Sequence, residues 1–116
     1  MKTKKRAMKA IGRYLELKGY EVLEEGWCHG KDKVDYIVDD CGCIAFVFGH
    51  AEENVGNGIP MKPIDRKKFE RLAAAYLAEH PEHADCEVRA DEASILILSD
   101  SRAMICHHVN ALGAIG

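Results

Sequence analysis

Apolar side chains recur every three or four residues in two segments of the chain, a spacing that places them on one face of a helix. The first predicted helix spans residues 5–18, and Gly19 follows it, as glycine commonly follows the last turn of a helix. The second spans residues 64–80, and Pro81 ends it because proline cannot continue the backbone hydrogen-bond pattern. Each helix therefore has an apolar face that must pack against another element.

The other segments contain short apolar runs of the kind found in strands. The five predicted strands span residues 20–23, 34–38, 43–48, 94–98 and 103–109. The run at 43–48 is apolar at nearly every position, as expected of a strand that is covered on both faces. Residues 26–33 and 39–42 are predicted to be turns, and residues 49–63 a long loop. The order αβββαββ predicts an α/β fold, with a mixed β-sheet flanked by helices.

Composition and length narrow the class of protein. The 116 residues suit one domain over residues 1–116, and 47% hydrophobic with 30% charged residues predicts a globular, soluble chain. No apolar run is long enough to span a membrane, so a membrane partner is not expected. The basic N-terminus lacks a following apolar segment, which argues against secretion. Five cysteines without a disulfide-like spacing predict free thiols and a cytoplasmic location.

Charge is unevenly distributed along the chain. Residues 1–18 contain seven basic residues and one acidic residue, so the rest of the chain carries a net charge of −9 within a total of −3. A second basic cluster lies between residues 62 and 71. Such clusters are either solvated helix faces or surfaces that bind phosphates, in which case the partner is DNA or another nucleic acid. The candidate nucleic-acid-binding residues are Lys4, Lys5, Lys9, Arg13, Lys62, Arg66, Lys67 and Lys68. The pattern leaves the oligomeric state open.

One carboxylate stands within a predicted strand. Asp35 is flanked by apolar residues, and a carboxylate there is costly unless it is paired, binds a ligand or faces solvent at the strand end. His50 follows the next strand, so the two side chains can meet. One carboxylate and one imidazole make a poor Mg²⁺ site, because that ion prefers six oxygen ligands. A transition-metal site would need Glu52, Glu53 or Cys43 as a further ligand.

Several short motifs, in order and at matching spacing, resemble the YraN-like family of bacterial proteins. The segment Tyr14–Tyr20 resembles the Tyr-Leu and Lys-Gly-Tyr pattern at the end of the family's first helix. Trp27 precedes Asp35 by eight residues, as the family's Trp precedes the Asp of a Gly-Glu-Ile-Asp-Leu-Ile motif. Phe46–His50 begins eleven residues after Asp35, where the family has Phe-Val-Glu-Val-Lys. Three later segments also resemble the family, namely Ala74–Leu77, Val88–Asp91 and His108–Leu112.

The resemblance implies a restriction-endonuclease-like core, in which Asp and Glu hold a divalent metal and Lys orients water or stabilises charge. Only the Asp carries over, as Asp35. Phe48 stands at the position of the Glu, His50 at that of the Lys, and Lys33 at that of the Glu in the Gly-Glu-Ile-Asp motif. Met8 falls near a further Glu of the first helix. Losing these carboxylates removes the negative field that Mg²⁺ needs, so a vestigial site at Asp35 and His50 is predicted.

Three functional hypotheses follow. The first is a catalytically degenerate, endonuclease-like protein that needs no cofactor and binds nucleic acid through the basic helices. The second is an active nuclease that uses Mg²⁺ or Mn²⁺, in which Glu52 or Glu53 joins Asp35 as a ligand. The third is a protein-interaction module whose long loop or exposed sheet edge contacts a partner instead of nucleic acid.

Overall fold

The computed structural model describes residues 2–53, 62–99 and 102–113, which form two helices, five strands and one short 3₁₀ helix. The elements are α1 (Lys2–Leu17), β1 (Glu21–His29), β2 (Asp32–Asp40), β3 (Cys43–Glu53), α2 (Arg66–Glu79), η1 (Pro81–His83), β4 (Glu87–Ser99) and β5 (Arg102–His108). Apart from the 3₁₀ helix, this is the predicted order αβββαββ. The predicted α/β class is confirmed.

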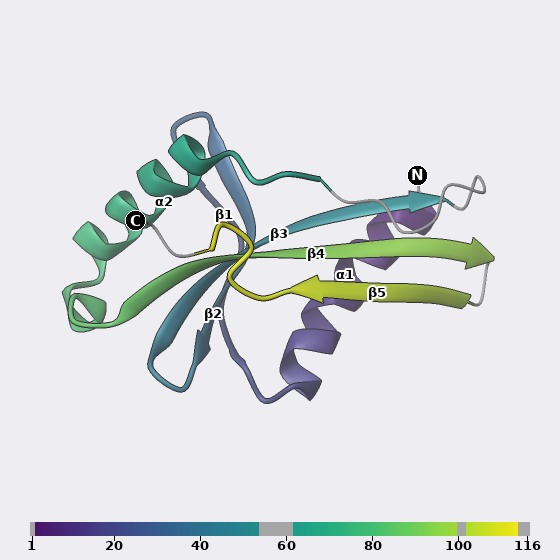
Figure 1. The fold of residues 1–116 in the computed structure, drawn as a ribbon, viewed down its shortest axis with the longest axis horizontal. Helices are drawn as coiled ribbons and strands as arrows, with labels where there is room; N and C mark the ends of the chain where they lie inside the picture. Colours follow the sequence, from purple (N-terminus) through teal and green to yellow (C-terminus); the bar gives the residue numbers. More distant parts are fainter. Residues whose placement is uncertain (1, 54–61, 100–101, 114–116) are drawn as a thin grey trace.

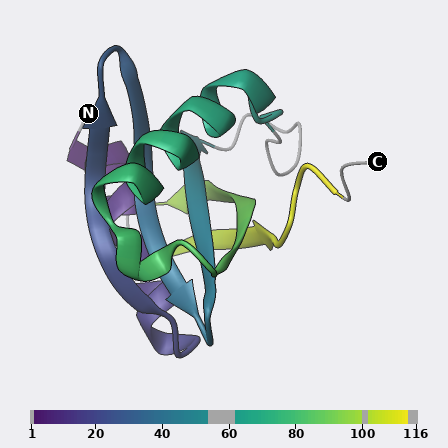
Figure 2. The ribbon, with the colours of Figure 1, turned by 90° about the vertical axis from the view of Figure 1, so that its left-hand side faces the viewer.

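The five strands form one mixed sheet in the order β1-β2-β3-β4-β5 (Figure 1). β3 and β4 are parallel, and every other pair of neighbours is antiparallel. Parallel neighbours need a crossover connection, and α2 lies within the connection between β3 and β4. The two helices cover opposite faces of the sheet, as the side view in Figure 2 shows.

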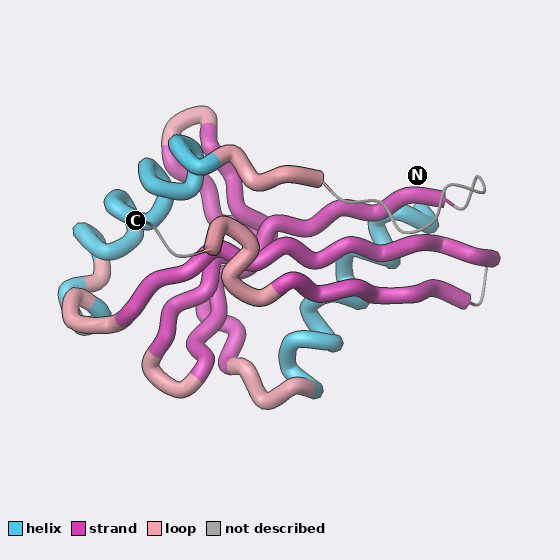
Figure 3. The backbone as a smooth tube through the Cα atoms, in the orientation of Figure 1, coloured by secondary structure: helices cyan, strands magenta, loops and turns pink. Residues whose placement is uncertain are grey.

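β3 is the strand about which both halves of the core are built. Ala45 and Val47 point toward α1, whereas Ile44 and Phe46 point toward α2, and all four are fully buried. Successive residues of a strand alternate between faces, so a strand covered on both sides must be apolar throughout. The prediction for this segment is confirmed. β3 is the middle strand of the five, and Figure 3 shows its backbone running beside β4.

Several predicted boundaries are wrong: β1 to β4 are each longer than the predicted strand, whereas β5 spans Arg102–His108 instead of 103–109. β1 continues through the first half of the predicted turn 26–33, and β2 begins at Asp32. The chain reverses at Gly30, whose φ of 60° favours glycine. β3 continues to Glu53, so the first part of the predicted loop 49–63 is a strand in register with β4. The rest of that loop, residues 54–61, lies outside the described residues. Backbone pairing with a neighbouring strand stabilises these extensions. A local hydrophobic pattern does not show which strands will pair, so it does not predict them.

The helix and the later strand boundaries also move. α1 begins at Lys2 instead of residue 5, and α2 spans Arg66–Glu79 instead of residues 64–80. Asp65 caps α2, because its Oδ1 accepts a hydrogen bond from the Lys68 backbone N–H at 3.2 Å. β4 begins at Glu87 instead of residue 94, since the charged residues in its first half have buried partners, described below.

Candidate functional site

Asp35 lies on β2, partly buried, where it contacts the neighbouring strand. Its Oδ2 accepts a hydrogen bond from the backbone N–H of Gly49 on β3 at 2.7 Å. A side chain at Gly49 would meet α1, because an added Cβ would lie 2.8 Å from Met8 Cε and 3.0 Å from Ile11 Cδ1. Glycine therefore lets α1 approach β3 beside the Asp35 carboxylate.

A pocket of about 320 Å³, here called the Asp35 pocket, opens beside this carboxylate on the face of the sheet that carries α2. Residues from β2, β3, β4, the segment before α2 and the first turn of α2 surround it. Its lining includes Lys33, Asp35, Phe48, His50, Lys62, Ile64, Asp65, Lys68 and Glu92. The fold thus brings together all four residues of the predicted vestigial site and adds two lysines of the predicted nucleic-acid-binding set.

Each carboxylate of the Asp35 pocket is already engaged by a donor of the protein. Asp35 accepts from Gly49, and Asp65 caps α2. Glu92 is almost completely buried, and its Oε1 lies 3.0 Å from Nδ1 of His108. The Ser94 hydroxyl donates to the other oxygen of Glu92. These negative charges are therefore partly compensated within the protein.

The lysines of the pocket, unlike its carboxylates, have no described partner of opposite charge. Among the described residues, no carboxylate lies within ion-pair distance of Lys33, Lys62 or Lys68. Lys68 Nζ lies 5.5 Å from the centroid of the Phe48 ring, a cation–π arrangement. Phe48, at the position that corresponds to the Glu of the Phe-Val-Glu-Val-Lys pattern, thus holds a lysine beside the pocket. In the part of the chain that the structure describes, the three lysines of the pocket therefore have no ion-pair partner.

The residues around Asp35 do not fit a divalent metal. His50 Nε2 lies 3.0 Å from Glu52 Oε1, so His50 pairs with Glu52 and not with Asp35. Glu52 and Glu53 are exposed, and neither lines the pocket. Cys43 lies at the opposite end of β3 from His50. Within the described ranges, no three His, Cys, Asp or Glu side chains are arranged to hold a metal ion.

A second polar cluster, the Asp91 network, lies on the α1 face of the sheet. Asp91 is fully buried; its Oδ1 accepts from Arg89 Nε at 3.0 Å and from the Asn110 backbone N–H at 2.9 Å. Its Oδ2 accepts from Arg89 Nη2 at 3.2 Å and lies 2.9 Å from His107 Nε2. With Nε2 donating to Asp91, Nδ1 of His107 accepts from the Tyr14 hydroxyl at 3.3 Å. The network joins β4, β5 and α1.

The partners of Asp91 set the charge states of the network. Burial alone would raise the pKa of the Asp91 carboxyl, but hydrogen bonds from His107 and Arg89 lower it below its ordinary value. Arg89 also donates to Asp40 Oδ2 at 2.9 Å and to the Tyr20 hydroxyl at 3.3 Å. In the described structure, no buried side-chain nitrogen or oxygen lacks a hydrogen-bond partner. The Asp91 network is thus a cluster whose buried polar atoms are satisfied within the protein.

The Asp91 network is a unit that the sequence pattern did not predict. The available signal was Arg89 and Asp91, two residues apart on one face of a strand, in a segment that resembles the family. The histidine that contacts Asp91 is His107, which precedes the matched segment His108–Leu112. His108 points to the opposite face and contacts Glu92.

The predicted nucleic-acid-binding residues occupy two separate surfaces. Lys5, Lys9 and Arg13 are exposed on α1, and the side chain of Lys4 lies outside the described part of the structure. Lys62, Arg66, Lys67 and Lys68 lie before and in α2, on the opposite face of the sheet. Arg66 Nη2 donates to the Leu112 carbonyl at 3.3 Å. One flat interface cannot include both surfaces.

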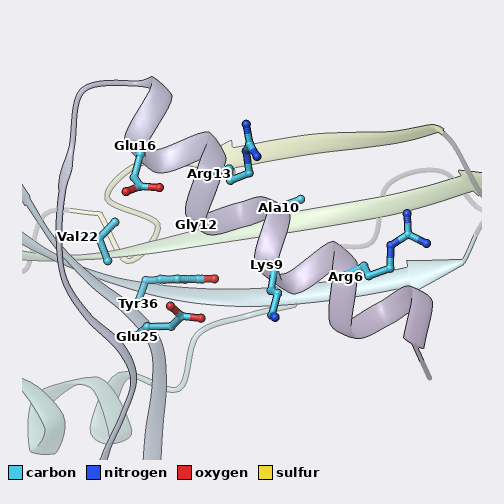
Figure 4. Close-up of a pocket in the computed structure, with 9 residues that line it drawn as sticks. All are labelled: Arg6, Lys9, Ala10, Gly12, Arg13, Glu16, Val22, Glu25 and Tyr36. Carbon is cyan, nitrogen blue, oxygen red and sulfur yellow. The ribbon is translucent and has the colours of Figure 1, made fainter.

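A larger pocket of about 750 Å³ lies between α1 and strands β1 and β2 (Figure 4). Lys9 extends beside Tyr36 and Glu25, whereas Arg6 and Arg13 extend away from them. Glu16 also lines this pocket, so its walls contain both acidic and basic side chains. Charges of both signs also line the Asp35 pocket.

No family model matches the chain, but several curated proteins are similar to it. A UPF0102 protein of Beutenbergia cavernae is 33% identical over 102 residues, which cover 85% of this chain and 86% of that protein. A UPF0102 protein of Paramagnetospirillum magneticum is 36% identical over 83 residues, or 67% of this chain and 64% of that protein. A UPF0102 protein of Rhodopseudomonas palustris is 30% identical over 93 residues, which cover 79% of this chain and 72% of that protein. None of the described helices is long and apolar enough to cross a membrane.

Proposed function

The chain belongs to the UPF0102 family, the YraN-like family that its motifs resemble, and on this premise we propose that it is a restriction-endonuclease-like domain that binds the phosphate backbone of nucleic acid without cutting it. The charge arrangement of the Asp35 pocket carries the proposal. Its carboxylates are engaged by protein donors, whereas Lys33, Lys62 and Lys68 have no described carboxylate partner. Free ammonium groups are the usual contacts of phosphate oxygens.

Binding without cleavage follows from the same residues. A nuclease of this kind needs a metal to polarise the phosphate and to generate hydroxide. Asp35 is the one carboxylate of the motif that is retained, and it accepts the Gly49 N–H, while Phe48 offers no ligand atom. The lysines can neutralise a bound phosphate, but they supply no activated water. No metal-dependent step is therefore assigned to this chain.

The two basic surfaces provide a matched test. The triple variant Lys62→Gln, Lys67→Gln, Lys68→Gln removes three positive charges on the α2 side, and Lys5→Gln, Lys9→Gln, Arg13→Gln removes three from α1. We expect the α2-side variant to reduce the slope of log affinity against log salt by about 2 to 3, because each lost phosphate contact contributes about 0.7 to 0.9. The α1 variant should change the slope less.

The measurement is fluorescence anisotropy with labelled single-stranded and duplex DNA, in EDTA, across a series of salt concentrations. Equal losses in the two variants would contradict the assignment of the α2 side. Absence of binding by the parent chain at low salt would contradict nucleic-acid binding altogether and would favour a protein-interaction module.

Plasmid cleavage tests the second part of the proposal. The parent chain and Asp35→Ala are incubated with Mg²⁺ or Mn²⁺, and nicking is followed on a gel. We expect no cleavage by either protein. Nicking that disappears in Asp35→Ala would show an active nuclease, and Glu52→Gln and Glu53→Gln would then identify the missing ligand.

A further inference from the structure

A second pocket, here called the apolar pocket, adjoins the Asp35 pocket. Its volume is about 600 Å³, and the two pockets share Lys62, Pro63, Ile64 and Glu92 in their walls. The rest of the apolar pocket comes from the end of β5 and the residues after it, including His108, Val109 and Ala111. Val109 is 49% exposed, which makes it one of few large apolar side chains left open to solvent in the described structure.

The two pockets complement each other chemically. The Asp35 pocket has lysines without described carboxylate partners, whereas Ile64 and Val109 contribute apolar side chains to the lining of the apolar pocket. A ligand that fills both must be anionic at one end and flat or apolar at the other. A nucleotide has this composition, because its phosphate is anionic and each face of its base is largely apolar.

We propose that the two pockets together bind one nucleotide of a single-stranded nucleic acid, with the phosphate in the Asp35 pocket and the base in the apolar pocket. The inference rests on the proposed function and makes it more specific. A base inside a duplex is stacked and paired, so its faces are not available to a pocket. The arrangement therefore selects an unpaired nucleotide over the same nucleotide in a double helix.

Glu92 and His108 stand where the two pockets meet. The Glu92 carboxylate accepts hydrogen bonds from the Ser94 hydroxyl and from His108 Nδ1. Its oxygens therefore face these donors of the protein and not the incoming phosphate. The side chain of His108 is 35% exposed and lines the apolar pocket. This pairing keeps a buried acid in the wall from repelling the anionic end of the nucleotide.

The first experiment compares three probes by two-dimensional amide NMR in EDTA at constant ionic strength. The probes are thymidine 5′-monophosphate, thymidine and inorganic phosphate. We expect the nucleotide to shift amide signals around both pockets, including Gly49 and Ala111, and to bind about tenfold more tightly than either fragment. Nucleotide binding no tighter than that of inorganic phosphate would overturn the proposal.

Two variants test the base contact and the phosphate contact separately. Each is compared with a control that makes the same kind of substitution at an exposed position outside both pockets. Val109→Ser should weaken the nucleotide about tenfold and leave inorganic phosphate unchanged, whereas Leu17→Ser, an 83% exposed leucine on α1, should change neither. Lys68→Gln should weaken both the nucleotide and inorganic phosphate, whereas Lys31→Gln in the β1–β2 turn should not. A Val109→Ser variant that binds as the parent does would overturn the base assignment.

Oligonucleotides distinguish this inference from the proposed function. We expect single-stranded thymidine oligonucleotides to bind more tightly than duplex of equal charge, and Val109→Ser to remove that difference. The nucleotide inference would be overturned if single strand and duplex bound with equal affinity. Binding of the phosphate backbone would still stand if the salt dependence continued to depend on Lys62, Lys67 and Lys68. Loss of all binding at low salt would overturn both.

Discussion

Two aspartates in the sheet, both within motifs that resemble the same family, have opposite surroundings. Asp91 on β4 is fully buried and accepts four hydrogen bonds, from Arg89, His107 and the Asn110 N–H. Asp35 on β2 is partly buried, accepts one from Gly49, and borders a pocket with lysines. A buried carboxylate whose oxygens are all engaged stabilises the fold, whereas Asp35 lies at the edge of an open pocket that also contains lysines.

The largest expected difference is in stability. Asp91→Asn removes the charge that compensates the buried Arg89 guanidinium, so we expect the free energy of unfolding to fall by about 3–5 kcal/mol. Urea unfolding followed by circular dichroism measures this loss. Asp85→Asn, at an exposed turn position before β4, is the control and should stay within about 0.5 kcal/mol of the parent. If Asp91→Asn lowered the free energy of unfolding no more than Asp85→Asn does, Asp91 would not stabilise the fold and the two aspartates would not differ in this respect.

Acid unfolding tests the same contrast through protonation. The pKa of Asp91 in the folded chain lies below its ordinary value of 3.8, so the ionised carboxylate favours the folded state. The stabilisation by the ionised carboxylate is fully present at a pH above the pKa of Asp91 in the unfolded chain. It is lost as the pH falls below 3.8 and passes through the lower pKa of Asp91 in the folded chain. Stability measured against pH should therefore fall less steeply in this window for Asp91→Asn than for the parent. Parallel curves would contradict the shift.

A substitution on the α1 side tests how tightly that layer is packed. A Cβ added at Gly12 would lie 2.8 Å from the Tyr36 hydroxyl oxygen, which donates to the Met8 carbonyl at 3.0 Å. We expect Gly12→Ala to destabilise the chain by about 1–3 kcal/mol through overpacking, despite the better helix propensity of alanine. Thermal unfolding measures the change, and a stabilised variant would show that α1 can move away from the sheet.

The smallest expected change in stability is at Asp35. The amide oxygen of Asp35→Asn still accepts the Gly49 N–H, so we expect the free energy of unfolding to change by less than about 1 kcal/mol. Removing a negative charge beside three lysines should at the same time strengthen binding of inorganic phosphate and of DNA. The result is checked by the urea and anisotropy measurements, and weaker binding would indicate that Asp35 itself holds the ligand.

Much of the architecture follows from local pattern. The spacing of apolar residues located both helices, and the apolar run around Phe46 indicated a strand covered on two faces, because each of these patterns reflects burial by a single element. The motifs around Asp35, Phe48 and His50 indicated the family, which the comparisons confirm. These features depend on residues that are close in the sequence.

Tertiary structure decided what the sequence pattern could not. The length of β4 and the role of Asp91 depend on Arg89, His107 and Asn110, which meet only when β5 and the chain after it pack beside β4. The Asp35 pocket likewise joins Lys33 on β2 to Lys68 on α2. Partners that lie tens of residues apart leave no periodic signal, because burial of a charge is stabilised by contacts formed on folding. Local patterns in the sequence thus predicted the elements and the family, whereas the packing of those elements placed Asp91 in a buried network and Asp35 beside an open pocket.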